Sequence, residues 1–440
     1  MTDRTIAAGT DRETTGSESA DPAPKHEEPT NETKGRGKIG ALSSRNFRLL
    51  WTGLIIANSG SWMATTAEGW LVTELEPERA SLYVGIIAMA FALPMILLTM
   101  VGGAVADRFP RMRLLWIVQI VYMSAGLILA FLTLTDLVEV WMLPIYAFLL
   151  GVGLAFDSPT RQSILPDIVS KEQLAGAVSL NSASYTGAAL IGPAIAGALI
   201  PLIGVGGVYL FASVSVIAVM IALRKMTGVP DYAAAKGNPV PIFDSIKEGV
   251  RFAIDTRVIF GVLALSVVTG VFTRSYNPLL VVFARDEFNV GSFLFGLMIA
   301  APGLGTLLSA FVIASRVDTG GRAKKMLFAS MALGVVQISF AVMPWYAGAL
   351  PLLILTGVFS TLLAANMATE IQLQVPPRLR GRLMSIYMLT LAGIPAFGTL
   401  ISGAIANMIG VRPTVGGAAV IMVIGVLLIF KRNSELRSID

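Results

Sequence analysis

Long apolar runs separated by short polar segments dominate this chain and decide what it can fold into. Of its 440 residues, 55% are hydrophobic and 14% are charged, whereas a soluble domain carries about 25% charged residues. A helix needs about 20 apolar residues to cross a bilayer. Twelve segments come close to this requirement: about 49–74, 81–105, 114–135, 140–157, 174–201, 203–223, 257–281, 291–314, 326–344, 348–368, 384–406 and 413–430. The sequence therefore predicts an all-α membrane protein with twelve transmembrane helices.

The absence of cysteine and the single histidine exclude several kinds of chemistry. The chain contains no cysteine, which rules out a disulfide framework, an iron–sulfur site and a thiol nucleophile. Its one histidine, His26, lies in a polar N-terminal segment, so a histidine metal cluster or general base is nearly excluded. Because the Gly-x-x-x-x-Gly-Lys pattern of a phosphate loop is also missing, we expect no cofactor and no metal. The net charge of +5 is spread over short loops, which argues against a nucleic-acid partner.

Changes in composition divide the chain into five parts. The first residues are rich in Thr, Glu, Asp, Gly and Pro, and they have too few apolar groups to offset the entropy of ordering. In the longest internal loop, Ile242, Ile246, Val250 and Ile254 recur at helical spacing and predict an amphipathic helix on the inner face. The expected parts are a disordered cytosolic tail (1–42), an N-terminal six-helix half (43–223), a cytosolic linker (224–256), a C-terminal six-helix half (257–430) and a cytosolic tail (431–440).

The basic residues predict the orientation in the membrane. Lys and Arg concentrate in cytosolic loops of membrane proteins. With the N-terminus in the cytosol, the outer side keeps only Arg79, Arg274, Arg285 and Arg412 of the 33 Lys and Arg residues. An even number of spans places the C-terminus on the same side. We therefore expect a multi-pass protein of the cytoplasmic (inner) membrane with both termini cytosolic.

Comparison of the chain with itself indicates a duplication. Shifted by 206 residues, segment 192–205 falls on segment 398–411 with seven of fourteen positions identical, three of them glycine pairs. An offset of 208 places Pro94 on Pro302. Shared small residues could reflect composition alone, but the two offsets agree on six plus six helices. The prediction is two pseudo-symmetric halves with a cavity between them.

A charged loop between two apolar runs gives the most specific motif. The segment Gly103-Ala-Val-Ala-Asp107-Arg108-Phe-Pro-Arg111-Met-Arg113 packs four charges that cannot lie in hydrocarbon. The order Gly-x-Val-Ala-Asp-Arg-x-x-Arg resembles the loop signature of the major facilitator superfamily. Within it, the chain is similar to the branch of enterobactin and drug exporters, which is drug:proton antiporter-like and includes the transmembrane secretion effectors. Further motifs carry this resemblance: Asp157-Ser-Pro-Thr-Arg161, Asn181, Gly192-Pro193 and Arg380-Gly381-Arg382-Leu-Met-Ser385.

The resemblance implies the major facilitator fold, alternating access and an inner gate. In the family, the charged loop latches against span eleven, which here begins with charged residues. The gate residues would be Gly103, Asp107, Arg108, Arg111, Arg380, Gly381 and Arg382. The alternative is a loop of solvated charges that only sets topology. Two positions depart from the family motif, Pro110 and Met112, and Ala147 stands where many proton-coupled antiporters have arginine.

Two polar stripes point to the transport path. Glu68 lies inside span one, where acids are costly enough to suggest function, and it shares a face with Asn58, Ser61 and Thr65. Span seven carries a second stripe, made of Ser266, Thr269, Thr273 and Asn277. Arg274 falls at Glu68 plus 206, which suggests an ion pair that closes the outer gate and couples transport to protons. Alternatively, Glu68 reaches water at the outer interface, and the offset of 208 would place Tyr276 opposite it.

Helix ends and one glycine-proline pair complete the candidate site. Asp157 and Arg161 lie one turn apart at the inner end of span four, and their repeat equivalents are Asn366 and Glu370. They predict inner-gate pairs or, equally well, solvated helix ends. Gly192, Pro193 and Gly197 in span five indicate either a hinge or close helix packing.

The function that best fits these patterns is secondary active export of a small, partly apolar molecule such as a drug or siderophore, in exchange for protons. The expected partners are that molecule, protons and the lipid bilayer, and we expect a monomer. A lysophospholipid or lipid facilitator is the alternative within the class. A membrane enzyme or a non-transporting scaffold is the alternative outside it, and the scarcity of His and Cys disfavours enzyme chemistry.

Overall fold

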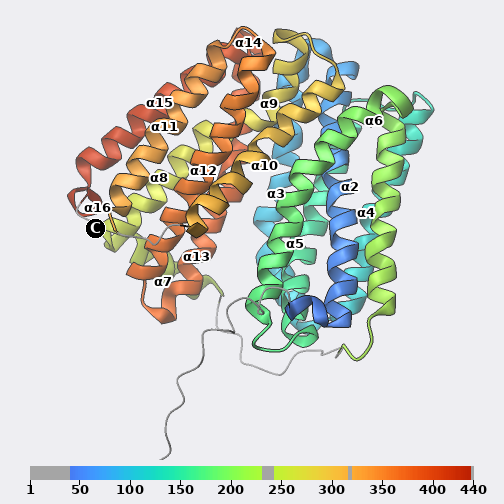
Figure 1. The fold of residues 1–440 in the computed structure, drawn as a ribbon, viewed down its shortest axis with the longest axis horizontal. Helices are drawn as coiled ribbons and strands as arrows, with labels where there is room; N and C mark the ends of the chain where they lie inside the picture. Colours follow the sequence, from blue (N-terminus) through green and yellow to red (C-terminus); the bar gives the residue numbers. More distant parts are fainter. Residues whose placement is uncertain (1–39, 230–241, 316–319, 438–440) are drawn as a thin grey trace, which may run out of the picture.

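The computed structural model describes residues 40–229, 242–315 and 320–437, and the elements within these ranges are helices (Figure 1). Most of the predicted N-terminal tail and residues 230–241 of the predicted linker therefore lie outside the described residues. A short 3-10 turn, η2 (Ala41–Ser43), precedes the N-terminal half. That half contains α2 (Arg45–Leu75), η3 (Pro77–Arg79), α3 (Ala80–Arg108), α4 (Arg111–Leu134), α5 (Met142–Ile168) and α6 (Leu174–Lys225).

The remaining elements form the linker helix, the C-terminal half and its end. The linker helix is α7 (Ile242–Asp255). The C-terminal half contains α8 (Arg257–Thr273), α9 (Tyr276–Val282), η4 (Phe283–Glu287), α10 (Ser292–Ser315), α11 (Arg322–Val342), α12 (Tyr346–Gln374), α13 (Pro377–Ala392), α14 (Ile394–Ile409) and α15 (Val411–Arg432), followed by α16 (Ser434–Arg437).

Twelve membrane crossings result from these helices. In the described ranges, ten helical segments are long and apolar enough to cross a membrane. One of them, α6, has 52 residues and makes two crossings, because Gly204 (φ 70°, ψ 171°) breaks it near the middle. The polar helix α2, with 31 residues, supplies the remaining crossing. The predicted all-α fold with twelve spans is confirmed.

The duplication is visible in the backbone. Gly410, 206 residues after Gly204, separates α14 from α15 and also has a positive φ of 89°. Both breaks use a conformation that side chains with a β-carbon disfavour. A second glycine pair at the same offset, Gly197 and Gly403, permits close helix crossings. A methyl group at Gly197 would overlap the carbonyl oxygen of Ser292, and one at Gly403 would overlap that of Ser81.

These crossings join the two halves. The first brings α6 onto α10 and the second brings α3 onto α14, so each half supplies one glycine to the other. Both lie toward the side of the molecule that carries η3 and η4, which we call the loop side. Figure 1 shows the blue-to-green N-terminal half and the yellow-to-red C-terminal half converging there and diverging at the other side.

The opposite side carries both chain ends of the described structure, and we call it the tail side. There, Asn46 donates a hydrogen bond of 2.8 Å to the carbonyl of Thr227, which joins the start of α2 to the end of α6. Asn433 likewise donates one of 2.6 Å to the carbonyl of Arg257. The linker helix α7 packs on α13 at this side, with Val250 and Ile254 exposed as expected for an amphipathic surface helix.

Spans seven and eleven differ from the sequence prediction, because each is divided in two. A proline removes one backbone donor and clashes with the carbonyl four residues earlier. Pro278 follows the break between α8 and α9, and Pro395 follows the break between α13 and α14. The carbonyl that Pro395 frees belongs to Leu391, and the guanidinium of Arg274 donates a hydrogen bond of 3.3 Å to it. The two breaks therefore support one another.

Candidate functional site: a cavity between the two halves

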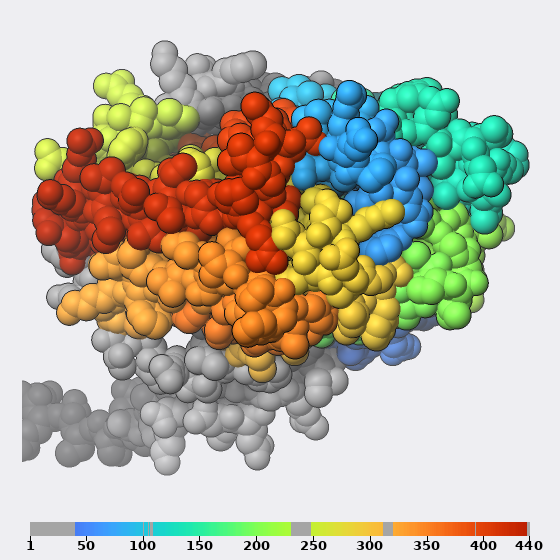
Figure 2. Space-filling view, turned by 90° about the horizontal axis from the view of Figure 1, so that it is seen from above, coloured from blue at the N-terminus to red at the C-terminus, as the bar shows by residue number. Residues whose placement is uncertain are grey.

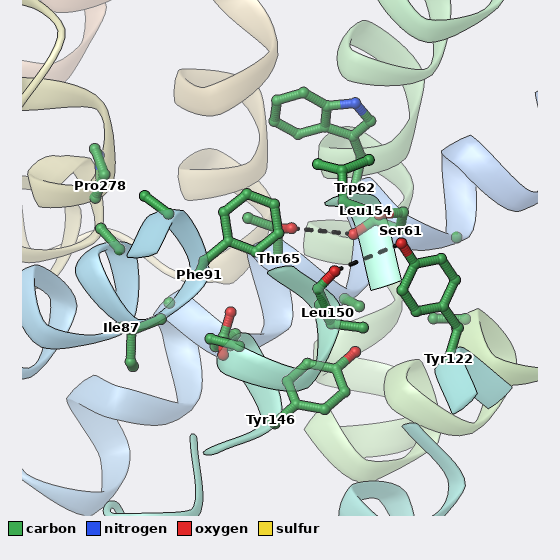
Figure 3. Close-up of a pocket in the computed structure, with 18 of the residues that line it drawn as sticks. Ser61, Trp62, Thr65, Ile87, Phe91, Tyr122, Tyr146, Leu150, Leu154 and Pro278 are labelled. Carbon is green, nitrogen blue, oxygen red and sulfur yellow. Dashed lines mark hydrogen bonds between the residues drawn. The ribbon is translucent and has the colours of Figure 1, made fainter. Parts of the chain in front are cut away.

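A cavity of about 420 Å³ lies between the halves. The N-terminal half supplies most of its wall, and α9, α10 and α14 supply the rest. Figure 3 shows the rings of Trp62, Phe91, Tyr122 and Tyr146 around the hollow. Tyr185 and Phe295 add two more rings, and Trp62 and Tyr185 are 5.7 Å apart between centroids. This lining suits a molecule with a substantial apolar surface.

The polar stripe of α2 faces this cavity. Ser61, Thr65 and Glu68 line it, and Thr65 donates a hydrogen bond of 3.1 Å to the carbonyl of Ser61 (Figure 3). Glu68 is 7% exposed, and its Oε1 atom has no hydrogen-bond partner among the described residues. Asn58 lies outside the lining and donates to the hydroxyl of Ser184 at 3.4 Å. Glu68 is therefore a buried acid with unused acceptor capacity beside the cavity.

Two buried tyrosines lie close enough to Glu68 for electrostatic interaction. The carboxylate of Glu68 interacts electrostatically with the hydroxyls of Tyr146 and Tyr209. The rings of these two tyrosines are 5.8 Å apart in an edge-on arrangement. The Tyr209 hydroxyl has no hydrogen-bond partner in the part of the chain that the structure describes. Sequence reasoning missed Tyr209, because span six carries no polar stripe to single it out.

The tail-side end of the cavity holds a polar group of three residues, two of which are charged. Asp157 and Arg161, one turn apart on α5, form an ion pair. Gln119 on α4 donates a second hydrogen bond to Asp157, of 3.1 Å. All three line the cavity. The predicted neighbours Asp157 and Arg161 thus meet within one half.

The repeat equivalents behave differently. Asn366 donates to the carbonyl of Leu362 in its own helix, at 2.7 Å. Glu370 is fully buried and pairs with Arg322 of α11 at 2.8 Å. An ion pair in a similar place in the N-terminal half joins Arg111 of α4 to Asp167 of α5 at 2.9 Å. In each half an ion pair ties the third span to the fourth at the tail side.

The span-seven stripe is split between two environments. Asn277 lines the large cavity. The buried Ser266 shares a hydrogen bond of 2.7 Å with Thr390, and Thr269 donates to the carbonyl of Leu265. Thr273, also buried, bonds within its own helix. The stripe therefore contributes one side chain to the cavity, because the break after α8 changes which face points inward.

Arg274 lies at that break and does not form an ion pair with Glu68 in this conformation. Its side chain is exposed, and its hydrogen bond goes to Leu391. The ion pair of Arg274 with Glu68 as the closure of the outer gate stays a prediction.

A different arginine closes the loop side. Arg285 in η4 donates a hydrogen bond of 2.9 Å to the Thr73 hydroxyl, and its guanidinium lies 5.9 Å from the centroid of the Trp70 ring. Ser292 adds a bond of 3.2 Å to the carbonyl of Gly197. Figure 2 looks onto this face, where the yellow residues of the C-terminal half meet the blue residues of α2 and α3. The sequence singled out Arg285 only as one of four basic residues on the outer side.

The predicted inner-gate loop is only partly described. Gly103, Asp107 and Arg108 lie in α3, and the side chains of Asp107 and Arg108 are outside the described set. Arg380 and Gly381 are exposed at the start of α13.

The charge of that helix start has another partner. Arg382 and Arg378 both pair with Glu248 of the linker helix α7, the second at 2.8 Å. Arg382 is the principal cause that lowers the pKa of Glu248 below its usual value. The sequence pattern does not single out Glu248, although it predicts the helix α7 itself.

The candidate hinge residues lie at close crossings. A methyl group at Gly192 would press on the carbonyl of Ser59 in α2, and the carbonyl of Pro193 faces Gly296 of α10. With Gly197 against Ser292, the segment packs tightly on both halves. The packing interpretation therefore has direct contacts in its favour.

No group of three or more His, Asp or Glu residues suited to a metal occurs among the described residues. The fold and the cavity define a multi-pass membrane transporter built from two six-helix halves. The family model of the transmembrane secretion effectors matches residues 37–440. The chain belongs to this family of the major facilitator superfamily, whose members are transporters and not enzymes.

Characterised relatives cover most of the chain. It is 28% identical to the staphyloferrin A transporter of Staphylococcus aureus over 393 residues, which are 86% of this chain and 94% of that one. It is 26% identical to the multidrug efflux pump Tap of Mycolicibacterium fortuitum, over 88% of this chain and 95% of that one. It is 24% identical to the enterobactin exporter EntS of Shigella boydii, over 75% and 78%.

Solved structures support the same fold. A bacterial homologue of the human lysosomal transporter Spinster, inward-facing and unoccupied, superposes with a TM-score of 0.69 at 14% identity, over 89% of this chain and 98% of that one. A bacterial homologue of the iron transporter ferroportin gives 0.65 at 18% identity, over 90% and 99%. At these identities the likeness extends to the fold alone.

Proposed function

We propose that this chain is a secondary active exporter of the cytoplasmic membrane. It moves a small, partly apolar molecule outward by alternating access, in exchange for protons, and it acts as a monomer. The observation that carries the proposal is the cavity between the halves, which is closed at the loop side and contains the buried acid Glu68.

The tail side is assigned to the cytosol. The loop side carries few basic residues, whereas the tail-side helix ends carry many, which fits the positive-inside rule. Arg45, Arg111, Arg257 and Arg322 all begin helices at the tail side. With this orientation, the conformation with a closed loop side is the one that accepts cargo from the cytosol.

The class of cargo follows from the lining. Six aromatic rings and many aliphatic groups favour a molecule that hides most of its surface from water. A volume of about 420 Å³ is within the range of small-molecule pockets. Relatives named for a siderophore and for several drugs fit the same class. A lipid facilitator is the competing function, and it would need no proton.

Glu68 is the proposed proton carrier. An ionised carboxylate in an apolar site is expensive unless it is paired, and Oε1 of Glu68 has no partner in the described part of the chain. Its proton affinity therefore changes whenever the cavity exchanges one side of the membrane for the other. Glu68 is therefore a titratable group that responds to access.

Alternating access requires two exchanges of contacts. The loop-side contacts of Arg285, Gly197 and Gly403 have to open. The tail side then has to close, and the Asp107 loop against the start of α13 is the proposed latch. In that step Arg382 would have to leave Glu248 in order to contact the Asp107 loop.

The test is flux in proteoliposomes that contain the purified full chain. Ligands found by thermal stabilisation against siderophores, macrolides and lysolipids are loaded, and their movement is measured with and without a pH gradient. Wild type should export a hit only when protons move the other way. Glu68→Gln should retain binding but lose the dependence on the gradient, whereas Glu78→Gln, an exposed glutamate on η3, should match wild type.

Three results would count against the proposal. Gradient-dependent flux that survives Glu68→Gln would remove Glu68 from proton coupling. Lysolipid flux that ignores the gradient would favour the lipid facilitator. Turnover of a lipid without any flux would indicate an enzyme.

A further inference from the structure

A cation without an acidic partner lies deep in the C-terminal half. Arg274 follows the 17 residues of α8, which at 1.5 Å per residue places it about 25 Å from the tail-side start of this span. The whole segment Arg257–Glu287 has 31 residues, so Arg274 lies past its middle and far from either membrane surface. An arginine at this depth faces water or a partner, because exposure to lipid is costly.

The surroundings of Arg274 are polar but not acidic. Its side chain is exposed and lines a small hollow that also contains Thr269, Thr273 and Ser360. The ionisable groups that interact electrostatically with its guanidinium are the hydroxyls of Tyr387 and Tyr276. In the part of the chain that the structure describes, Arg274 forms no ion pair.

A purely structural role accounts for one of its donors. The hydrogen bond to Leu391 satisfies the carbonyl that Pro395 frees at the break of span eleven. A guanidinium has five N–H groups, and a neutral donor could satisfy one carbonyl equally well. Among the described residues, the positive charge of Arg274 has no acidic partner and its donors form one hydrogen bond.

The position of Arg274 connects it to the large cavity. Asn277 and Pro278 follow Arg274 by three and four residues, just past the break, and both line the large cavity, whereas Arg274 lines the small hollow. A molecule whose anionic group binds Arg274 would therefore extend from this hollow toward the cavity wall at Asn277 and Pro278. Guanidinium groups bind carboxylates with two parallel hydrogen bonds, which adds direction to the charge.

We propose that Arg274 is the binding site for an anionic group, of the carboxylate class, on the transported molecule. The inference rests on the proposed function in one respect, that the cargo occupies the cavity. It adds a charge to a cargo so far described only as small and partly apolar. Glu68, in the opposite half, remains free to carry the proton.

The test is a binding measurement on the purified full chain, with two probes of nearly equal size. The first is 1-naphthaleneacetate, which carries a carboxylate, and the second is its neutral amide, 1-naphthaleneacetamide. Wild type should bind the carboxylate about tenfold more tightly or better, as charged hydrogen bonds lead one to expect. Arg274→Gln keeps a donor for Leu391 and should abolish this preference while it leaves amide binding unchanged.

Two further variants make the result specific. Arg274→Lys keeps the charge and should retain part of the preference. Arg251→Gln changes an exposed arginine on α7 and should retain all of it. Melting temperatures of all variants establish that each is folded.

The outcomes separate this inference from the proposed function. Equal binding of the two probes by wild type, binding of neither, or a preference that survives Arg274→Gln would each overturn the anion site. Wild type that shows the preference but no proton-coupled flux in proteoliposomes would support the anion site and contradict only the proposed proton exchange.

Discussion

The guanidinium of Arg285, in the C-terminal half, donates a hydrogen bond of 2.9 Å to the hydroxyl of Thr73, in the N-terminal half. The same guanidinium lies over the ring of Trp70, whose indole N–H donates to Glu74 at 2.7 Å. One charged side chain thus contacts two residues across the interface. These contacts hold the loop side closed, and they have to be lost whenever the cavity opens there.

Replacement of Arg285 should therefore shift the protein toward a conformation that is open at the loop side. A hydrogen bond from a charged donor contributes about 1.5–3 kcal/mol, so Arg285→Ala should change the ratio of conformations about tenfold or more. The chain has no cysteine, and Ala88→Cys in the cavity wall can report access to a membrane-impermeant maleimide. Labelling from the loop side should accelerate. Arg79→Ala, at an exposed position on η3, is the control, and equal rates in both variants would contradict the gate.

The glycine crossings predict a pair of matched effects. Valine at Gly197 or at Gly403 would press on a backbone carbonyl of the other half, and such overpacking costs about 1–3 kcal/mol. Each variant should favour the conformation with an open loop side, and the two effects should be similar because the crossings are pseudo-symmetric. The Ala88→Cys assay measures both. Gly417→Val is the control, since nothing lies within 4 Å of a β-carbon there. A strong effect of only one crossing would argue against symmetric gating.

The contact between the linker helix and α13 should depend on pH in one direction. The hydrogen bond from Arg382 is the main cause that lowers the pKa of Glu248 below its ordinary value of 4.5, and the charges of Arg382 and Arg378 act the same way. Because the pKa of Glu248 is lower when α7 packs on α13, the contact is fully formed above pH 4.5. It is lost as the pH falls through this lowered pKa. The protection of the α7 amides, corrected for the intrinsic pH dependence of exchange, should therefore stay constant from pH 8 to about 5.

A substitution tests the same contact without acid. Glu248→Gln should increase hydrogen exchange in α7 at neutral pH, because both arginines lose their charged partner. Asp255→Asn, which removes an exposed pair within the same helix, should have little effect. If the corrected protection of α7 in wild type were already lower at pH 6 than at pH 8, Glu248 would not be the group that holds it.

Each half has an ion pair between its third and fourth spans, Arg111 with Asp167 and Arg322 with Glu370. The two pairs should contribute differently to stability. Glu370 is fully buried beside Arg322, whereas the side chain of Asp167 is 23% exposed beside Arg111. Removal of one member of a buried pair typically costs about 3–5 kcal/mol, and an exposed pair contributes about 1 kcal/mol or less. Glu370→Ala should therefore lower the melting temperature in detergent clearly more than Asp167→Ala. Equal decreases in melting temperature would mean that burial does not determine how much each ion pair contributes to stability.

Much of the fold could be predicted because it depends on local composition. Hydropathy located the twelve crossings, and the charges between them indicated the side on which each loop lies. The repeat was also readable, since the glycines of segment 192–205 recur 206 residues later and occupy equivalent places in the two halves. The breaks in spans seven and eleven were missed, because a proline ends a helix only when neighbouring groups satisfy the carbonyl that it frees.

The sequence by itself therefore determined the class of protein, the number of spans and the acid Glu68 in a polar stripe, because burial in lipid constrains each segment separately. Only the tertiary structure decided which charges meet. It placed Arg285 on Thr73 and Trp70, Arg382 on Glu248, and Arg274 on Leu391 instead of Glu68. These contacts join helices that are distant along the chain, and their partners depend on helix rotation and on the conformation of the two halves, which periodicity does not encode.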